Sequence, residues 1–386
     1  MPDYDVAIVG LGAMGASAVL QLAKRGAMVI GFDRFDPPHC FGSSHGETRV
    51  TRRAIGEGEY LTPLAMRSHE LWREIERETG ANLLSETGAL IISSERDAAQ
   101  THVAGFFRKT VAAAEQFGIA HEILTAAQIR GRWPQFSVRD DEIGYFEPAA
   151  GFVRPEECVC AELMLARRYG ADIHTNETLL GFEASSGGVT VVADRGQYSA
   201  AKLILACGAW LPELLGEPYA SLFKVYRQTQ FWLEVEGAAA FAPDRFPVFI
   251  WELQNSRCGI YGFPALDGAS VIKVASEIFW PTTTPQSIKR IVSNDEIAAA
   301  YELVAPNLHG VGPRCLKATA CLYTVTPDFG FLIDTHPECE NIIVASPCSG
   351  HGFKHSPAIG EMLADMALGQ PPHCDIAPFC LSRFRD

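Results

Sequence analysis

The sequence predicts an α/β fold, α+β overall, in which a unit of parallel strands shares the chain with an antiparallel sheet. Three observations support this prediction. Residues 5–33 read as strand, glycine turn, helix and strand. Residues 225–280 alternate apolar and polar side chains with period two, which is typical of antiparallel strands open on one face. Residues 320–386 return to a strand, loop and helix pattern, so we expect the first unit to be discontinuous.

Length and composition predict a globular protein with two domains. The chain has 386 residues, of which 47% are hydrophobic and 20% are charged, so it can bury a large core. It contains no long polar or repetitive tract, which argues against disorder and against a solenoid. We expect one domain to comprise residues 1–85, 150–220 and 320–386, and the other to comprise residues 86–149 and 221–319.

Charge and cysteine content narrow the functional classes. The formal net charge of −14 opposes binding to nucleic acid and to anionic membranes, so an anionic substrate needs a local cluster of Lys and Arg. Eleven irregularly spaced cysteines indicate reduced thiols rather than a disulfide framework. Residues 5–23 follow no basic segment and contain three glycines, which disfavours a signal peptide or a membrane span. We therefore expect a soluble, cytoplasmic protein.

The N-terminal segment has the order of a Rossmann-type unit. The apolar run Asp5–Val9 predicts a strand, which leads through a glycine turn into the helical segment 16–25. Gly26 ends that helix. The apolar run 28–32 then predicts a second strand that closes on Asp33.

The glycine turn has the pattern Gly10-x-Gly12-x-x-Gly15. Gly10 permits a tight turn, Gly12 lets backbone N–H groups approach a pyrophosphate, and Gly15 lets the helix pack on the strand. Asp33 is placed to accept a hydrogen bond from a ribose hydroxyl, which favours FAD or NAD over NADP. The alternative is a turn that tolerates glycine and binds no ligand. The context therefore predicts dinucleotide binding.

The remaining segments supply further elements. Helices are predicted from Thr62 and Pro63 to Gly80, over about 155–168, from the capping box Ser293-Asn-Asp-Glu296, and from Ser356 and Pro357. Strands are predicted at Thr190–Ala193, Leu203–Ala206, Gln230–Val235, Phe249–Leu253, Ser270–Val274 and Asn341–Ala345.

A series of local motifs lies in order along nearly the whole chain. The motifs are Phe35-Asp-Pro-Pro-His39, Gly46-Glu-Thr-Arg-Val-Thr-Arg-Arg53 followed by Gly56-Glu-Gly58, Cys207-Gly-Ala-Trp210, Tyr261-Gly-Phe-Pro264, Ala320-Cys-Leu-Tyr-Thr324, Phe331-Leu-Ile-Asp334 and Ser349-Gly-His-Gly-Phe-Lys354. In this order and spacing they resemble the family of monomeric sarcosine oxidases and N-methyltryptophan oxidases. The terminal Pro378-Phe-Cys-Leu-Ser-Arg-Phe384 is most similar to the N-methyltryptophan oxidase branch.

The resemblance implies a glutathione-reductase-like FAD domain interleaved with an antiparallel-sheet substrate domain. It implies an oxidase that passes hydride from the carbon bound to the substrate nitrogen to flavin N5. Water then hydrolyses the imine, and dioxygen reoxidises the flavin to give hydrogen peroxide. The implied substrate is sarcosine or another N-methyl amino acid, with N-methyltryptophan, pipecolate and proline as alternatives. The implied protein is a monomer or weak homodimer.

Two other classes compete with this assignment. An NAD-dependent dehydrogenase would hold no bound chromophore. A flavoprotein electron-transfer subunit would hold a flavin that substrate reduces but that air reoxidises poorly.

Two cations match the family's substrate-binding pair. By resemblance, Arg52 and Lys354 hold the substrate carboxylate, and a guanidinium fork with a lysine charge suits that role. Arg49 matches a position that we assign to catalysis. The alternative for Arg49 and Arg53 is a surface or ion-pairing role, which we prefer for Arg53.

Two further positions match the family's cofactor site. Cys321 matches the cysteine that is joined to the 8α-methyl group of FAD, and the alternative is a small buried hydrophobe. Gly350, in the Ser349–Lys354 motif, is assigned to cofactor binding.

Four residues match positions beside the flavin and substrate. Lys273 aligns with a lysine that faces the flavin ring through water and activates oxygen, and the alternative is the solvated face of a strand. His351 matches a catalytic residue, with a satisfied core histidine as the alternative. Tyr261 and Tyr323 match aromatic residues of the substrate pocket, with core packing as the alternative.

Two positions depart from the family pattern. Glu277 stands where sarcosine oxidases have a histidine, and Ile55 replaces a tyrosine that commonly follows the arginine pair. Both changes leave the substrate side chain open.

A metal site is not predicted. The possible ligands within the last part of the chain fit no zinc spacing. They are His336, Cys339, Cys348, His351 and His355.

Overall fold

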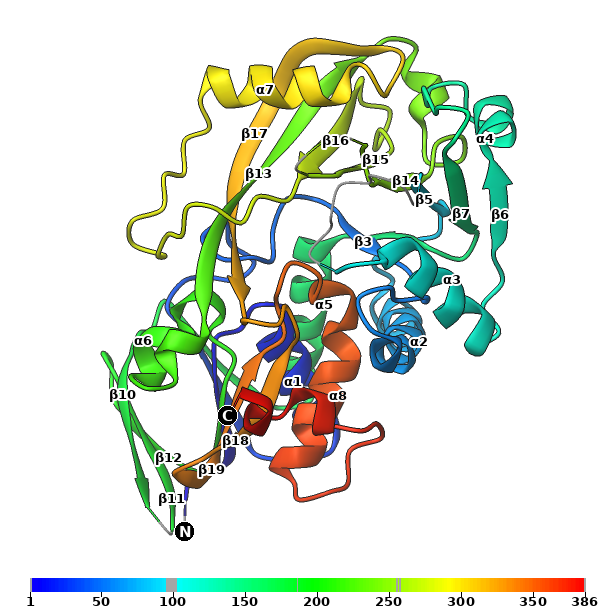
Figure 1. Ribbon diagram of the computed structural model, residues 1–386. Coiled ribbons are helices and arrows are strands. Elements are labelled where there is room, and N and C mark those ends of the chain that lie inside the picture. The colour runs from blue at the N-terminus through cyan, green and yellow to red at the C-terminus, as the bar shows by residue number, and fades with distance from the viewer. Residues whose placement is uncertain (1, 95–102, 186, 255, 257, 385–386) are drawn as a thin grey trace.

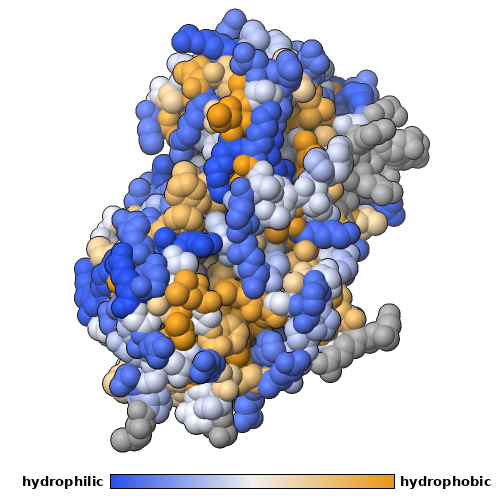
Figure 2. All heavy atoms as spheres, turned by 90° about the vertical axis from the view of Figure 1, so that its left-hand side faces the viewer, coloured by the Kyte–Doolittle hydropathy of each residue, from blue (hydrophilic) through white to orange (hydrophobic). Residues whose placement is uncertain are grey.

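The fold consists of two units stacked along the long axis of the molecule (Figure 1). A computed structural model describes residues 2–94, 103–185, 187–254, 256 and 258–384. The lower unit in Figure 1 contains both chain ends, and the upper unit carries a second large sheet beneath helix α7 (Asn294–Val304). Two long strands extend from the upper sheet toward the lower unit. Seen from its left-hand side, the lower part of the molecule exposes a patch of hydrophobic side chains among hydrophilic ones (Figure 2).

The sheet of the lower unit confirms the predicted Rossmann-type start. Its strands are β1 (Tyr4–Val9), β2 (Val29–Asp33), β9 (Asp172–Thr175), β10 (Leu179–Ser185), β11 (Gly188–Ala193), β12 (Gln197–Leu205), β18 (Leu332–His336) and β19 (Cys339–Ser346). Strand β1 pairs in parallel with β2 and β12, and β12 pairs in parallel with β19. The last strand of the chain's final segment therefore completes the first sheet.

The helices of this unit pack as their apolar faces require. They are α1 (Ala13–Lys24), α2 (Thr62–Thr79), α5 (Pro155–Arg168), α6 (Leu211–Leu215) and α8 (Ser356–Ala367). Helix α1 begins three residues before the predicted Ala16, because Gly12 is its N-cap and Gly15 already lies in its first turn. A helix-breaking residue at a helix start is tolerated when the backbone must pack closely.

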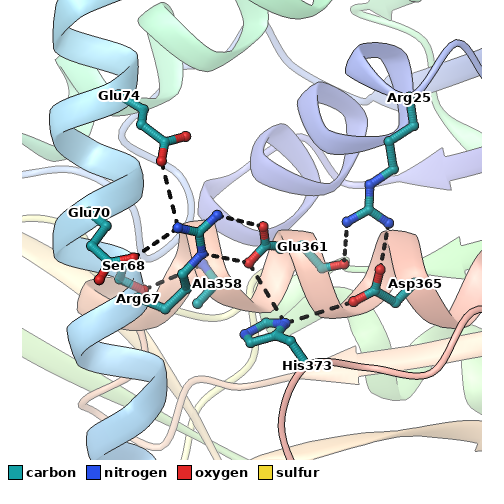
Figure 3. A network of polar contacts seen from close by, with 9 residues as sticks. All are labelled: Arg25, Arg67, Ser68, Glu70, Glu74, Ala358, Glu361, Asp365 and His373. Carbon is teal, nitrogen blue, oxygen red and sulfur yellow. Dashed lines mark hydrogen bonds and ion pairs between the residues drawn. The ribbon is translucent and has the colours of Figure 1, made fainter.

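A surface network ties α1, α2 and α8 together (Figure 3). Arg67 of α2 donates two parallel hydrogen bonds of 2.9 Å to the carboxylate of Glu361 on α8. Arg25, which follows α1, donates to Asp365 of α8 at 2.6 Å. Such bidentate and linked pairs fix orientation more than isolated surface pairs do. The network therefore holds α8, and with it the segment that precedes it.

The upper sheet has eight strands and differs in two ways from the prediction. Its order is β17 (Val311–Val325), β13 (Lys224–Val235), β16 (Val271–Ser276), β15 (Ile260–Phe263), β14 (Val248–Trp251), β5 (Ala89–Ser93), β7 (Ile143–Glu147) and β6 (Glu122–Thr125). Strands β14 and β5 pair in parallel, whereas the other neighbours are antiparallel. Residues 228–233 of β13 are all buried, so the expectation of one open face is wrong there. Period-two alternation predicts a strand, but neither the direction of its partners nor what covers its outer face.

Smaller elements connect the two units. A three-stranded sheet orders β3 (Arg49–Thr51), β8 (Gly151–Val153) and β4 (Leu84–Ser85), and helices α3 (Phe106–Gln116) and α4 (Ala126–Arg132) lie beside the upper sheet. The expected boundary at residue 320 falls within β17. The division into domains stays a prediction. Among the described residues no helix combines the length and apolar character needed to cross a membrane.

Candidate active site

One cavity of about 390 Å³ runs from the glycine turn of the lower unit to side chains of the upper sheet. Gly12, Ala13 and Asp33 line one part of it, and Tyr261, Tyr323 and Lys354 line another. A cavity between a nucleotide-binding turn and a second sheet is a usual place for a cofactor and its substrate. The cavity therefore joins the two sets of residues that the sequence singled out.

The glycine turn is shaped by close backbone packing. Gly10 has a φ of +89°, and a Cβ atom there would lie 2.5 Å from the carbonyl oxygen of Ala206. A Cβ atom on Gly15 would lie 1.8 Å from the carbonyl oxygen of Gly10. Both contacts exclude any side chain. The turn thus places the N-terminus of α1 against the cavity, where backbone N–H groups and the helix dipole suit a pyrophosphate.

Asp33 is held at the end of β2 by the same turn. Its carboxylate accepts hydrogen bonds of 2.9 Å from the backbone N–H groups of Leu11 and Phe35. Asp33 is buried and lines the cavity. A carboxylate in this position next to a phosphate-binding turn fits a ribose hydroxyl. The residues present therefore fit a dinucleotide such as FAD.

The predicted carboxylate-binding cations meet at a shared acid. Arg52 Nη2 donates to Glu57 Oε2 at 2.5 Å, and Lys354 Nζ lies 3.7 Å from Glu57 Oε1. Lys354 also donates to the carbonyl oxygen of His351 at 2.6 Å. Arg52 and Lys354 are 1% and 5% exposed, and both line the cavity with Glu57. Buried cations beside a cavity form a site for an anionic ligand.

A second buried acid positions this cluster. Glu147 accepts hydrogen bonds from the backbone N–H groups of Arg53 at 2.7 Å and Ala54 at 3.3 Å, and from Tyr145 at 2.9 Å. The two backbone hydrogen bonds therefore fix the chain just after Arg52. Arg53 itself points elsewhere and forms an ion pair of 3.8 Å with Glu86, in line with the preference for an ion-pairing role.

Lys273 is hydrogen-bonded to the backbone of the segment that precedes Arg49. Its Nζ donates to the carbonyl oxygens of Gly46 at 2.8 Å and Thr48 at 2.6 Å, and lies 4.2 Å from the centre of the Phe263 ring. Lys273 is 4% exposed, which excludes the solvated face. Burial lowers the pKa of Lys273 well below its ordinary value, and the charge of Arg49 lowers it further.

Arg49 lines the cavity, and its charge acts on both Lys273 and Cys321. Its guanidinium donates to the carbonyl oxygens of Thr48 at 2.9 Å and Ser43 at 2.7 Å. These local bonds fix the side chain in the cavity, so a surface role is excluded. The positive charge of Arg49 lowers the pKa of the Cys321 thiol, although burial of that thiol raises it more.

Cys321 is fully buried in β17. Its Sγ accepts a hydrogen bond of 3.5 Å from Gln230 of the neighbouring strand β13. Cys321 and Tyr323 are two positions apart on one strand and so lie on the same face of the sheet. Tyr323 lines the cavity, so the thiol lies under its wall. All eleven cysteines, each within the described part of the chain, are free thiols.

The aromatic residues and His351 complete the wall. The hydroxyl oxygens of Tyr261 and Tyr323 are 3.5 Å apart, and burial raises the pKa of both phenols. His351 Nε2 donates to the carbonyl oxygen of Phe329 at 3.1 Å, and its ring stacks on Phe331 at 4.6 Å. His351 and the two tyrosines all line the cavity.

Three residues of the site were not assigned a role from sequence. They are Glu57, Glu147 and Gln230. Glu57 lies in the motif Gly56-Glu-Gly58, four residues after the arginine pair, and this proximity in sequence could have indicated its role. Glu147 and Gln230 carry no local signal, because their partners lie 94 and 91 positions away. Over residues 2–94, 103–185, 187–254, 256 and 258–384, no His, Cys, Asp and Glu side chains are grouped to hold a metal ion.

Comparison with known proteins places the chain among flavoproteins. A family model described as FAD dependent oxidoreductase matches residues 5–366. The chain is 39% identical to monomeric sarcosine oxidase of Streptomyces avermitilis, over 95% of this chain and 94% of that protein. It is 34% identical to N-methyl-L-tryptophan oxidase of Yersinia pestis, over 99% of this chain and 100% of that protein.

Solved structures share the fold. The amino acid oxidase NikD in its open form superposes with a TM-score of 0.84 at 24% identity, covering 98% of this chain and 97% of that one. Glycine oxidase from Geobacillus kaustophilus superposes with a TM-score of 0.78 at 21% identity, covering 100% of both chains.

Proposed function

The chain belongs to the FAD-dependent oxidoreductase family, as its motifs predicted, and from this premise we propose that it oxidises the CH–NH bond of a secondary amino acid. The proposed substrate is sarcosine or another N-methyl amino acid, and the proposed acceptor of the electrons is dioxygen. The relatives named sarcosine oxidase and N-methyl-L-tryptophan oxidase support this class of substrate. N-methyltryptophan and the cyclic amino acids pipecolate and proline are the alternatives.

The cluster of Arg52, Lys354 and Glu57 carries the proposal. It places two buried cations on the same cavity as the dinucleotide turn, in a protein whose net charge is −14. An amino acid carboxylate bound there would gain charge-assisted hydrogen bonds in a site of low dielectric constant. The carboxylate then fixes the substrate by one end, so that its C–N bond is oriented within the cavity.

Several residues of this chain would hold FAD. Gly10, Gly12, Gly15 and Asp33 fit its pyrophosphate and ribose, and Gly350 lines the far part of the cavity. FAD supplies the two-electron acceptor that the side chains themselves lack. His351 donates to a backbone carbonyl in this structure, which leaves its ring fixed against Phe331 at the cavity wall. Its proposed role is to orient the substrate.

The proposed function is tested by anaerobic mixing with amino acids. Sarcosine, N-methyltryptophan, proline and pipecolate are added in turn to the purified yellow protein while the flavin absorbance is followed. Bleaching by an N-methyl amino acid, followed by return of colour and formation of hydrogen peroxide in air, supports an oxidase. A colourless protein that needs NAD, or a bleached protein that air reoxidises poorly, contradicts it.

We propose that Cys321 carries FAD covalently. Replacement of Cys321 by alanine is expected to leave the fold intact, because the side chain is small and buried, but to release the flavin on acid precipitation. The measurement is the yellow colour of the pellet and of the supernatant. Cys348→Ala is the matched control, since the thiol of Cys348 lines the cavity. A yellow pellet from Cys321→Ala refutes the assignment.

Binding of a carboxylate is expected to weaken as the pH rises through about 8. Burial lowers the pKa of Lys354 to about 8, and the nearby Glu57 partly offsets that effect. Lys354 is therefore charged below this pH and neutral above it, so attraction for an anion is lost at high pH. The Kd of (methylthio)acetate, followed by flavin absorbance, reports the change. Lys354→Met should abolish this pH dependence; an unchanged profile in the variant contradicts the assignment.

A further inference from the structure

Of the two departures from the family pattern, only one faces the cavity. Ile55 is fully buried and packs in the hydrophobic core of the lower unit. Glu277 lines the cavity together with Lys354, Tyr261 and Tyr323. The change at Ile55 therefore concerns packing, whereas the change at Glu277 places a carboxyl group at the substrate end of the cavity.

The backbone next to Glu277 is held by a buried amide. Gln228 of β13, which is 2% exposed, donates to the carbonyl oxygen of Ile278 at 2.6 Å. It also accepts from the N–H of Ile278 at 3.0 Å. This reciprocal pair fixes the chain as it leaves β16, the strand that carries Lys273. The position of Glu277 is therefore set by the fold.

The carboxylate of Glu277 reaches the turn that contains Gly350. Its Oε1 lies 3.2 Å from the place where a Cβ atom on Gly350 would be, and the ring of Tyr323 lies 2.9 Å from that place. Gly350 has a φ of +87°, a conformation that other residues rarely adopt. The absence of a side chain at this glycine leaves room for the Glu277 carboxylate beside the Tyr323 ring.

The charge of Glu277 acts on the two tyrosines and on the lysine at the substrate end of the cavity. Besides burial, it raises the pKa of Tyr261 and of Tyr323. It also acts to raise the pKa of Lys354, against the larger effect of burial. This part of the cavity thus has two cations, Arg52 and Lys354, that can bind a ligand carboxylate, and one carboxylate, Glu277, that can bind a ligand cation. An amino acid in its zwitterionic form carries the complementary pair of charges one carbon apart.

We propose that Glu277 is a specificity-determining residue, which binds the positively charged amine of a zwitterionic substrate whose carboxylate lies on Arg52 and Lys354. The proposal rests on the proposed function and deepens it. Glu277 favours ligands that carry both charges and disfavours carboxylates that lack a cation, because its own negative charge attracts an ammonium group and repels an anion.

A pair of isosteric ligands tests this selection directly. Trimethylglycine carries a carboxylate and a fixed quaternary ammonium, and 3,3-dimethylbutanoate has the same shape with carbon in place of the charged nitrogen. Neither offers an N–H group or a nitrogen lone pair, so binding is measured without turnover. Both are titrated into the flavin-loaded protein by calorimetry and by flavin absorbance, for wild type, Glu277→Gln and Glu277→Asp.

Wild type is expected to prefer trimethylglycine, and Glu277→Gln to lower the ratio of the two affinities by about tenfold or more. Glu277→Asp should keep part of the preference because it keeps the charge, and it serves if the glutamine variant folds poorly. Glu213→Gln, which removes another carboxylate of the cavity wall on α6, should leave the ratio unchanged.

The outcomes separate the two proposals. If both ligands bind and the ratio is the same in wild type and Glu277→Gln, the role of Glu277 is refuted while the carboxylate site stands. If neither ligand binds to wild type, and sarcosine does not bleach the flavin, the proposed function fails with it. A ratio that falls equally in Glu213→Gln also overturns the inference, because the effect would then belong to the net charge of the cavity.

Discussion

Replacement of Lys273 by methionine is expected to slow reoxidation by dioxygen by roughly two to three orders of magnitude, with much less effect on substrate oxidation. Electron transfer to dioxygen creates a superoxide anion, and a fixed cation in a site of low dielectric constant stabilises it strongly. Substrate oxidation leaves a cationic imine, which a neighbouring ammonium does not stabilise. Methionine keeps the apolar stem between Phe263 and the Gly46–Thr48 segment while it removes the charge.

Stopped-flow absorbance separates the two half-reactions, with anaerobic reduction and aerobic reoxidation followed independently. Because the pKa of Lys273 is lowered, wild-type reoxidation should decline as rising pH neutralises the ammonium, at a pH below the ordinary lysine value. Lys317→Met is the matched control. Lys273 Nζ lies 5.7 Å from the centre of the Trp232 ring, and the exposed Lys317 lies 4.5 Å from the same centre. Equal reoxidation rates in Lys273→Met and Lys317→Met would show that Lys273 is not the oxygen-activating cation.

Replacement of Arg52 by alanine is expected to weaken carboxylate binding by about 2–5 kcal/mol, which is roughly 30- to 5,000-fold in Kd. The variant removes a guanidinium that is 1% exposed, while Lys354 stays 3.7 Å from Glu57. Part of the loss is expected because the substrate carboxylate then lies near Glu57 with one buried cation fewer to offset the repulsion between the two carboxylates. Titration of the flavin absorbance with (methylthio)acetate measures the Kd.

Arg53→Ala provides the control for this experiment, since Arg53 is the next residue and its ion pair with Glu86 lies outside the cluster. Its Kd should match that of wild type. Thermal unfolding of each variant separates loss of binding from loss of fold. An Arg52→Ala protein that folds and binds (methylthio)acetate as tightly as Arg53→Ala contradicts the assignment of Arg52 to the substrate carboxylate.

The parts of the fold that the sequence predicted are those with local signals. The strand, glycine turn and helix at Gly10–Gly15 depend on neighbours within one turn, so their order follows from the pattern of residues. The parallel pairing of β14 with β5 joins segments more than 150 positions apart, and nothing in either strand specifies its partner. The same reason explains why the buried outer face of β13 was not foreseen.

The site shows the same division. Arg52 and Lys354 were found because their flanking motifs are distinctive, although the contact that brings them together is made by Glu57. The sequence showed that Glu277 was unusual but could not show that it faces the cavity while Ile55 faces the core. That distinction depends on the register of β16 and on the hydrogen bonds between the Gln228 side chain and the backbone of Ile278. Both arise from pairing between distant segments.

The position of β19 in the first sheet bears on how the molecule is made. Strand β12 pairs with β1 and with β19, which lies near the C-terminal end of the chain. While the polypeptide is still emerging from the ribosome, the nucleotide-binding sheet therefore lacks a central neighbour, and α1 lacks the cover of α8. We therefore expect the sheet to be complete, and ready to bind the cofactor, only at the end of synthesis, because a chain cut short before β19 lacks one of the parallel neighbours of β12.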